Sequence, residues 1–74
     1  MDPNACFIRF LDAQCNDDTL EAFHAINDLS DWYLKGGFPA FYPESTVIVP
    51  AEFVHNTVVT FKFACDALGL LSRP

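Results

Sequence analysis

The sequence is poor in positive charge, because only four of its 74 residues are Lys or Arg, against ten Asp and Glu. The formal net charge is −6. A protein that binds nucleic acid needs clustered basic side chains to neutralise phosphates, so we expect no nucleic-acid partner. An acidic surface suits solubility or a basic protein partner. Inhibition of another protein by occupying its basic site is therefore one alternative function.

Paired cysteines and long apolar runs are also missing. The three cysteines, Cys6, Cys15 and Cys65, have no CxxC spacing, and an odd number does not match a disulfide framework. No apolar run approaches the ~18 residues of a membrane helix, and the first residues lack the basic start and apolar run of a signal peptide. These features predict a reduced, cytoplasmic protein that does not enter a membrane.

The motifs of several enzyme classes are absent as well, since the sequence contains no Gly-rich phosphate loop, no HExxH and no GxSxG. Each cysteine is next to apolar residues, where thiols are usually inert. A chain of this length is also small for enclosing a substrate in a pocket. We therefore expect a protein that is not an enzyme and has no catalytic residues or cofactor.

Apolar residues, in contrast, are abundant: they make up 51% of the sequence and include eight Phe. A domain of this size buries only roughly 60% of the surface that its unfolded chain exposes. So much apolar surface is difficult for a small monomer to hide. We expect a single domain over 1–74 that self-associates, most simply as a homodimer.

Capping signals and apolar spacing predict two helices in the first half. Asp2-Pro3 is typical of a helix start. The carboxylate can accept hydrogen bonds from backbone N–H groups that have no partner within the helix, and Pro fits the first helical position. The apolar stripe that follows predicts a helix over about 3–15, with Asn4 facing water, and consists of Phe7, Ile8, Leu11 and Cys15, flanked by Phe10. Asp18 and Glu21 have capping-box spacing, and an amphipathic pattern continues from there over about 19–36.

Gly36-Gly37 supplies a stop for the second helix. With Gly37 in the left-handed conformation, Phe38 would contact Tyr33 in the hydrophobic contact of a Schellman cap. A connector over 37–50 follows. Its last residues before Pro50, 46–49, are all β-branched, which predicts a short extended segment there.

The last third permits two interpretations. Helical spacing predicts a helix over about 51–69 whose broad apolar core face includes Phe53, whereas residues 57–63 have strong β propensity and could form a strand. The length of the periodic pattern favours the helix. The predicted fold is all-α, a compact three-helix domain with a short extended segment before the last helix. The alternative is an α+β fold with a C-terminal β-hairpin.

Four apolar residues fall outside the predicted core stripes and are candidates for an interface. Val59 and Phe63 lie on the polar side of the third helix, which suggests contact with a partner. Phe41 and Tyr42, between two prolines of the connector, either attach the connector to the core or meet a partner. Isolated exposed apolar residues are also common without any function.

Both histidines follow a glutamate by three residues, as Glu21/His24 and Glu52/His55. Glu-x-x-His pairs on two helices are part of the ligand set of di-iron and di-manganese bundles, so a metal-binding bundle is a second alternative. Both pairs lie on polar faces, however, and the two additional glutamates of such a site are missing. A simpler interpretation is that Glu21 and Glu52 lie in the first turn of their helices, where the helix dipole favours acidic residues, and that both histidines are solvated.

The segments DPNA at 2–5 and DWYLKGGFP at 31–39 resemble a pattern in small acidic proteins of bacteria, phages and other mobile elements, DPNA followed by DWL and GGFxP. Those proteins mostly have no assigned function. Tyr33 stands where that pattern commonly has Leu, and the resemblance covers about the first forty residues. It implies a helix, an amphipathic second helix and a Gly-Gly stop, in a small accessory or interaction protein of a bacterium or phage. It implies no catalytic residues.

Overall fold

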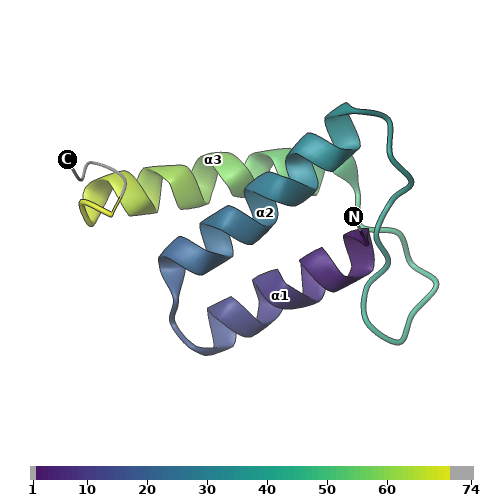
Figure 1. Ribbon diagram of the computed structural model, residues 1–74, viewed down its shortest axis with the longest axis horizontal. Coiled ribbons are helices and arrows are strands. Elements are labelled where there is room, and N and C mark those ends of the chain that lie inside the picture. Colours follow the sequence, from purple (N-terminus) through teal and green to yellow (C-terminus); the bar gives the residue numbers. More distant parts are fainter. Residues whose placement is uncertain (1, 71–74) are drawn as a thin grey trace.

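The computed structural model describes residues 2–70 and contains three helices there (Figure 1). They are α1 (Pro3–Cys15), α2 (Thr19–Leu34) and α3 (Ala51–Ala67). The predicted all-α fold is confirmed, with α2 and α3 each ending two residues before the predicted position. The alternative β-hairpin is wrong, because residues 57–63 lie within α3. The extended pairing found in the described residues is a single antiparallel bridge between Phe41 and Ile48.

Side chains at the predicted positions cap the first two helices. The Asp2 carboxylate accepts hydrogen bonds from the backbone N–H of Asn4 at 3.0 Å and of Ala5 at 3.4 Å. The Asp18 carboxylate accepts one from the N–H of Glu21 at 3.1 Å. Each bond satisfies an amide that has no partner within the helix. α3 begins after Pro50 without a side-chain cap.

All three helices end in the same way, at a residue with positive φ that donates one of the two backbone hydrogen bonds of a Schellman motif, while the next residue donates the other. These residues are Asp17 (φ 55°), Gly36 (φ 82°) and Gly69 (φ 74°). In each motif the next N–H reaches back five residues, from Asp18 to Ala13, from Gly37 to Trp32 and from Leu70 to Cys65. Asp17 is the one residue of the three that has a Cβ and must hold this conformation against its steric preference.

The stop of α2 differs from the prediction in two details. Gly36, not Gly37, takes the left-handed conformation, and Phe38 packs on Trp32 rather than on Tyr33. The rings of Trp32 and Phe38 meet edge to face with centroids 5.5 Å apart, and Trp32 Nε1 donates to the Phe38 carbonyl at 2.9 Å. Gly37 lies against the indole so closely that a Cβ there would overlap it. The glycine pair therefore serves two purposes, a left-handed turn and room for the Trp32 ring.

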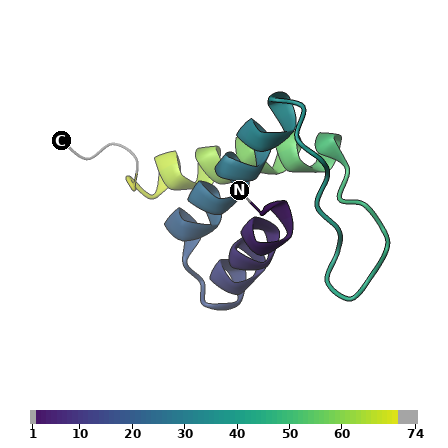
Figure 2. The same cartoon turned by 45° about the vertical axis from the view of Figure 1, so that its right-hand side comes forward.

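α2 is the central helix and packs against both α1 and α3, and neighbouring helices run in opposite directions (Figures 1 and 2). α1 and α3 meet through the rings of Phe10 and Phe61, which are edge to face at 5.4 Å. The buried residues of the central cluster include Phe7, Phe10, Ile26, Leu29, Val49 and Val54. Within α1, Phe10 is buried and Ile8 and Cys15 are exposed. The true core face of α1 therefore runs through Cys6, Phe7, Phe10 and Ala13.

The connector is fastened to the helices by two polar side chains. The Tyr33 hydroxyl donates to the Val49 carbonyl at 2.7 Å and accepts the Ala40 N–H at 2.9 Å. Asn4 Oδ1 accepts the N–H of Phe41 at 2.7 Å. Ala40 and Val49 also pair with each other through a 2.8 Å backbone bond, and both are fully buried. These bonds hold the two arms of the connector together while its tip projects from the helices (Figure 2).

Candidate interaction surface

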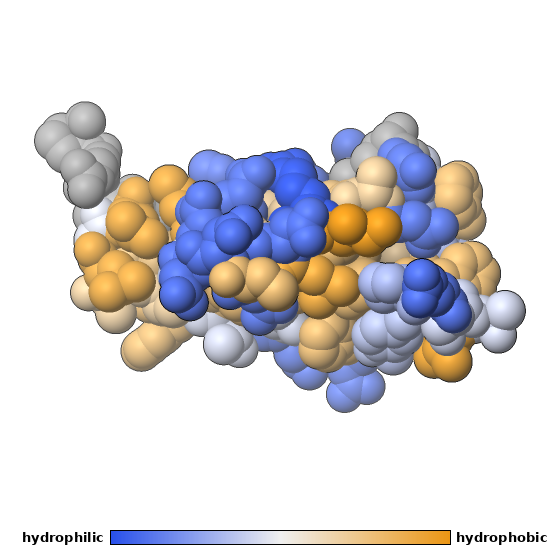
Figure 3. Space-filling model, turned by 90° about the horizontal axis from the view of Figure 1, so that it is seen from below, coloured by the Kyte–Doolittle hydropathy of each residue, from blue (hydrophilic) through white to orange (hydrophobic). Residues whose placement is uncertain are grey.

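α3 has two distinct faces. Its buried and half-buried apolar residues include Val54, Val58 and Cys65, which follow the spacing of the helix face that packs on α2. The opposite face carries the predicted interface residues Val59 and Phe63, whose exposed fractions are 68% and 77%. Figure 3 shows hydrophobic residues gathered at the end of the molecule where α3 finishes, beside a hydrophilic block over the middle.

A regular stripe of exposed residues runs along this outer face. We call it the exposed seam, and its members alternate at intervals of three and four residues: Phe53, Asn56, Thr60, Phe63 and Ala67. That spacing is the a/d pattern of a coiled coil, with Val59 in a flanking position. The seam contains no charged side chain, and Glu52 and Asp66 lie on its flank. The sequence pattern predicts Phe63 as an exposed residue but does not reveal the seam, because helical spacing places Phe53 on the core face.

A groove of about 340 Å³ adjoins the exposed seam between α1 and α3. Its walls are Phe7, Phe10, Leu11, Gln14, Tyr42, Phe53, Thr57, Thr60 and Phe61. Phe53 and Thr60 belong to both the groove and the seam, so the two form one continuous surface. None of these lining residues is Asp, Glu, His, Lys, Arg or Cys, and their one titratable group is the Tyr42 phenol. Such a lining can bind an apolar surface but provides no acid–base pair.

Phe41 and Tyr42, the other two predicted interface residues, lie on different sides of the connector. The Tyr42 ring packs edge to face on Phe7 with centroids 5.5 Å apart and forms one end of the groove. Phe41 is 39% exposed and lines a second hollow with Asn4 and Ile8, which Tyr42 also borders. Tyr42 therefore attaches the connector to the core, whereas only Phe41 faces away from it.

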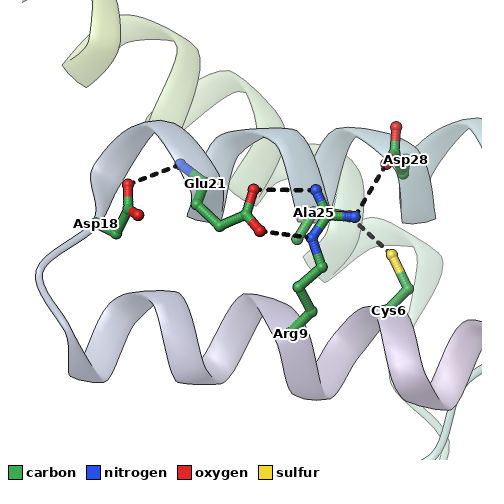
Figure 4. Close-up of polar contacts among 6 residues, drawn as sticks. All are labelled: Cys6, Arg9, Asp18, Glu21, Ala25 and Asp28. Atoms are coloured by element: carbon green, nitrogen blue, oxygen red, sulfur yellow. Dashed lines mark hydrogen bonds and ion pairs between the residues drawn. The ribbon is translucent and has the colours of Figure 1, made fainter.

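Negative charge is concentrated outside α3. Residues 2–50 carry eight acidic side chains against Arg9 and Lys35, whereas α3 has Glu52, Asp66 and Lys62. Arg9 from α1 reaches across to α2 and forms ion pairs with Glu21 at 2.9 Å and Asp28 at 3.4 Å (Figure 4). The hydrogen bond from Arg9 holds the pKa of the Glu21 carboxyl below its ordinary value. α3 thus carries a net charge of only −1, against −6 for residues 2–50.

The predicted metal ligands are placed apart or engaged in other contacts. The Glu21 carboxylate binds Arg9, while His24 is exposed beside Phe23. His55 Nδ1 is 2.6 Å from Ser30 Oγ and links α3 to α2, and Glu52 is exposed. Within residues 2–70, no three His, Cys, Asp or Glu side chains are close enough together to hold a metal ion.

The buried thiols serve packing. Cys6 Sγ donates to the Ala25 carbonyl at 3.0 Å, between α1 and α2 (Figure 4). Burial raises the pKa of the Cys6 thiol, and Asp28 raises it further; burial likewise raises the pKa of the Cys65 thiol. A raised pKa keeps a thiol protonated and weakly nucleophilic. Cys15, in contrast, is exposed at the end of α1.

None of the helices in the described part of the chain combines the length and the apolar character that crossing a bilayer requires. Comparisons with protein-family models, with curated proteins and with solved structures gave no match.

Proposed function

We propose that this chain is a small, non-enzymatic interaction protein that forms a homodimer through α3. The exposed seam carries the proposal, because five exposed residues at coiled-coil spacing, two of them Phe, form an uncharged stripe in an otherwise acidic chain. Burying a Phe side chain that was exposed contributes roughly 1.5–3 kcal/mol. A partner that covers Phe53 and Phe63 therefore gains substantial free energy, and a second copy supplies two more such residues.

The chemistry of the surface supports binding rather than catalysis. The groove next to the seam is lined by aromatic, aliphatic and hydroxyl or amide side chains. General acid–base catalysis needs a titratable group within hydrogen-bond reach of the substrate, and nucleophilic catalysis needs an activated nucleophile. The buried Cys6 and Cys65 do not open into this groove. A protein-binding surface fits this composition.

The two segments that resemble mobile-element proteins have structural roles in this chain. Asp2 caps α1 and Asn4 holds the connector, while Trp32 and Gly37 pack together at the stop of α2. These residues therefore stabilise the fold, and the proposed binding surface lies elsewhere, on α3. The resemblance supports a role as a cytoplasmic accessory protein of a bacterium or one of its mobile elements.

The oligomeric state tests the proposal directly. Sedimentation velocity on the full chain over about 1 µM to 1 mM should show a concentration-dependent monomer–dimer equilibrium. A single monomeric species over the whole range would contradict the proposal. The same samples, mixed with a strongly basic protein at low and high salt, test the alternative of an acidic inhibitor, since an electrostatic complex is lost as salt rises.

A further inference from the structure

We infer that the two copies pair through antiparallel α3 helices, with Phe63 of each copy packed against Thr60 of the other. This inference rests on the proposed homodimer and specifies its geometry. It follows from the residue order of the exposed seam, which combines two large side chains with three smaller ones along about 21 Å of helix.

Side-chain size selects the antiparallel arrangement. In the seam, Phe53, Thr60 and Ala67 occupy one heptad position, and Asn56 and Phe63 occupy the other. Antiparallel pairing matches one position with the other, which sets Phe63 opposite Thr60 and Asn56 opposite Ala67 of the second copy. Parallel pairing would set Phe63 against Phe63 and Ala67 against Ala67, one layer overfilled and another empty. Close packing favours layers that combine a large residue with a small one.

Charge selects the register. An antiparallel pair centred on Val59 would place Glu52 directly opposite Asp66 of the second copy, which is an unfavourable like-charge contact. The register with Phe63 opposite Thr60 instead places Asp66 near Val59. Antiparallel alignment also sets the two helix dipoles in opposite directions. One register therefore satisfies both the packing and the charges of α3.

The same arrangement reaches the groove between α1 and α3. Since Thr60 is shared by the seam and the groove, the Phe63 side chain of the second copy also shields the Thr60 edge of that groove. The remaining acidic surface, which includes Asp17 and Asp18 at the end of α1, stays in solvent. Because both copies are negatively charged, added salt should strengthen this dimer by screening their repulsion.

Substitution of the seam gives the first test. Phe63→Asp should weaken the dimer by at least about 100-fold, because it removes a central apolar residue and adds a charge at the contact. Leu34→Asp is the matched control, since Leu34 is a similarly exposed apolar residue, at 72%, on α2. It should leave the dissociation constant within about threefold. Circular dichroism verifies that both variants remain helical, as substitutions at exposed positions should.

Disulfide trapping gives the second test, in a Cys15→Ser background that removes the exposed thiol. An equimolar mixture of Asn56→Cys and Ala67→Cys chains should form the mixed disulfide under mild oxidation, whereas each chain alone should not crosslink. Crosslinking of Asn56→Cys with itself would indicate parallel helices and overturn the arrangement. A dimer that persists in Phe63→Asp would also overturn it, while leaving self-association intact. A wild-type chain that is monomeric throughout would instead overturn the proposed function.

Discussion

The Tyr33 hydroxyl donates a 2.7 Å hydrogen bond to the carbonyl of Val49, sixteen residues further along the chain. The same oxygen accepts the N–H of Ala40, so one side chain of α2 closes both arms of the connector. This bond fixes the residue that immediately precedes Pro50 and α3. The position of α3, and with it the exposed seam, therefore depends on a hydroxyl group at the end of α2.

Tyr33→Phe should destabilise the fold by about 1–3 kcal/mol, because it leaves the amide of Ala40 and the carbonyl of Val49 without their partner in a buried position. The free energy of unfolding in urea measures the loss. Tyr42→Phe is the matched control, since it keeps the ring that packs on Phe7 and leaves both Tyr33 bonds in place. Equal losses in the two variants would contradict this role of the hydroxyl.

Gly37→Ala should cost about 1–3 kcal/mol of stability, since the added methyl group overlaps the Trp32 indole. In a Trp32→Ala background the same substitution should be nearly neutral. Gly36→Ala provides the contrast: its Cβ meets open space, and its cost comes from the positive φ, so the cost should be the same in both backgrounds. Thermal or urea unfolding of the four variants and their two parents completes the comparison.

Asp17→Gly should stabilise the protein by about 0.5–1 kcal/mol, because glycine adopts the left-handed conformation of the α1 stop without a steric penalty. Removal of a negative charge from an acidic chain could produce a similar gain. Asp17→Asn separates the two causes, since it removes the charge and keeps a Cβ. If Asn equals Gly, the gain is electrostatic and the backbone explanation fails.

Stability should fall above about pH 9. Burial raises the pKa of the Cys6 and Cys65 thiols above the ordinary value of 9.0, and burial raises the pKa of Tyr33 above 10.0. The unfolded chain therefore releases these protons at a lower pH than the folded chain. The free energy of unfolding is constant below pH 9 with respect to these groups and decreases as the pH rises toward their folded pKa values. Urea titrations between pH 7 and 11 measure the decrease, and Cys6→Ala should reduce its slope.

Addition of Zn²⁺ or Mn²⁺ should leave the melting temperature unchanged. The Glu21 carboxylate is occupied by Arg9, and among residues 2–70 no three His, Cys, Asp or Glu side chains lie close enough together to hold a metal ion. Differential scanning fluorimetry with and without a chelator provides the measurement. A saturable increase that disappears in His24→Ala would revive the metal-binding alternative.

The helices and their ends could be predicted from the sequence because their signals are local. Asp2 and Asp18 bond to amides within three residues, and the backbone bonds of Gly36 and Gly37 that end α2 span three and five residues. The contact of Asn4 with Phe41 joins residues 37 positions apart and leaves no local signal. Asn4 was therefore expected to face water, although its amide holds the connector.

The candidate surface could be predicted only in part for a related reason. Periodicity gives the apolar sides of a helix but not which of them meets a neighbour. α3 has apolar residues on both sides, so Phe53 was assigned to the core, although it is 40% exposed. Phe63 was separated correctly because it stands among polar residues. The groove depends on how far apart α1 and α3 lie, which is set by the packing of both on α2.

The central place of α2 has a consequence for how the chain folds. Each of its two large interfaces joins helices that are adjacent in sequence. Short loops close quickly, and domains dominated by local contacts fold in microseconds to milliseconds. The α1–α2 hairpin has a connection of only three residues, 16–18, whereas α3 returns after sixteen. We therefore expect the hairpin to form first, during synthesis as well as in refolding, and to present the surface on which α3 then docks.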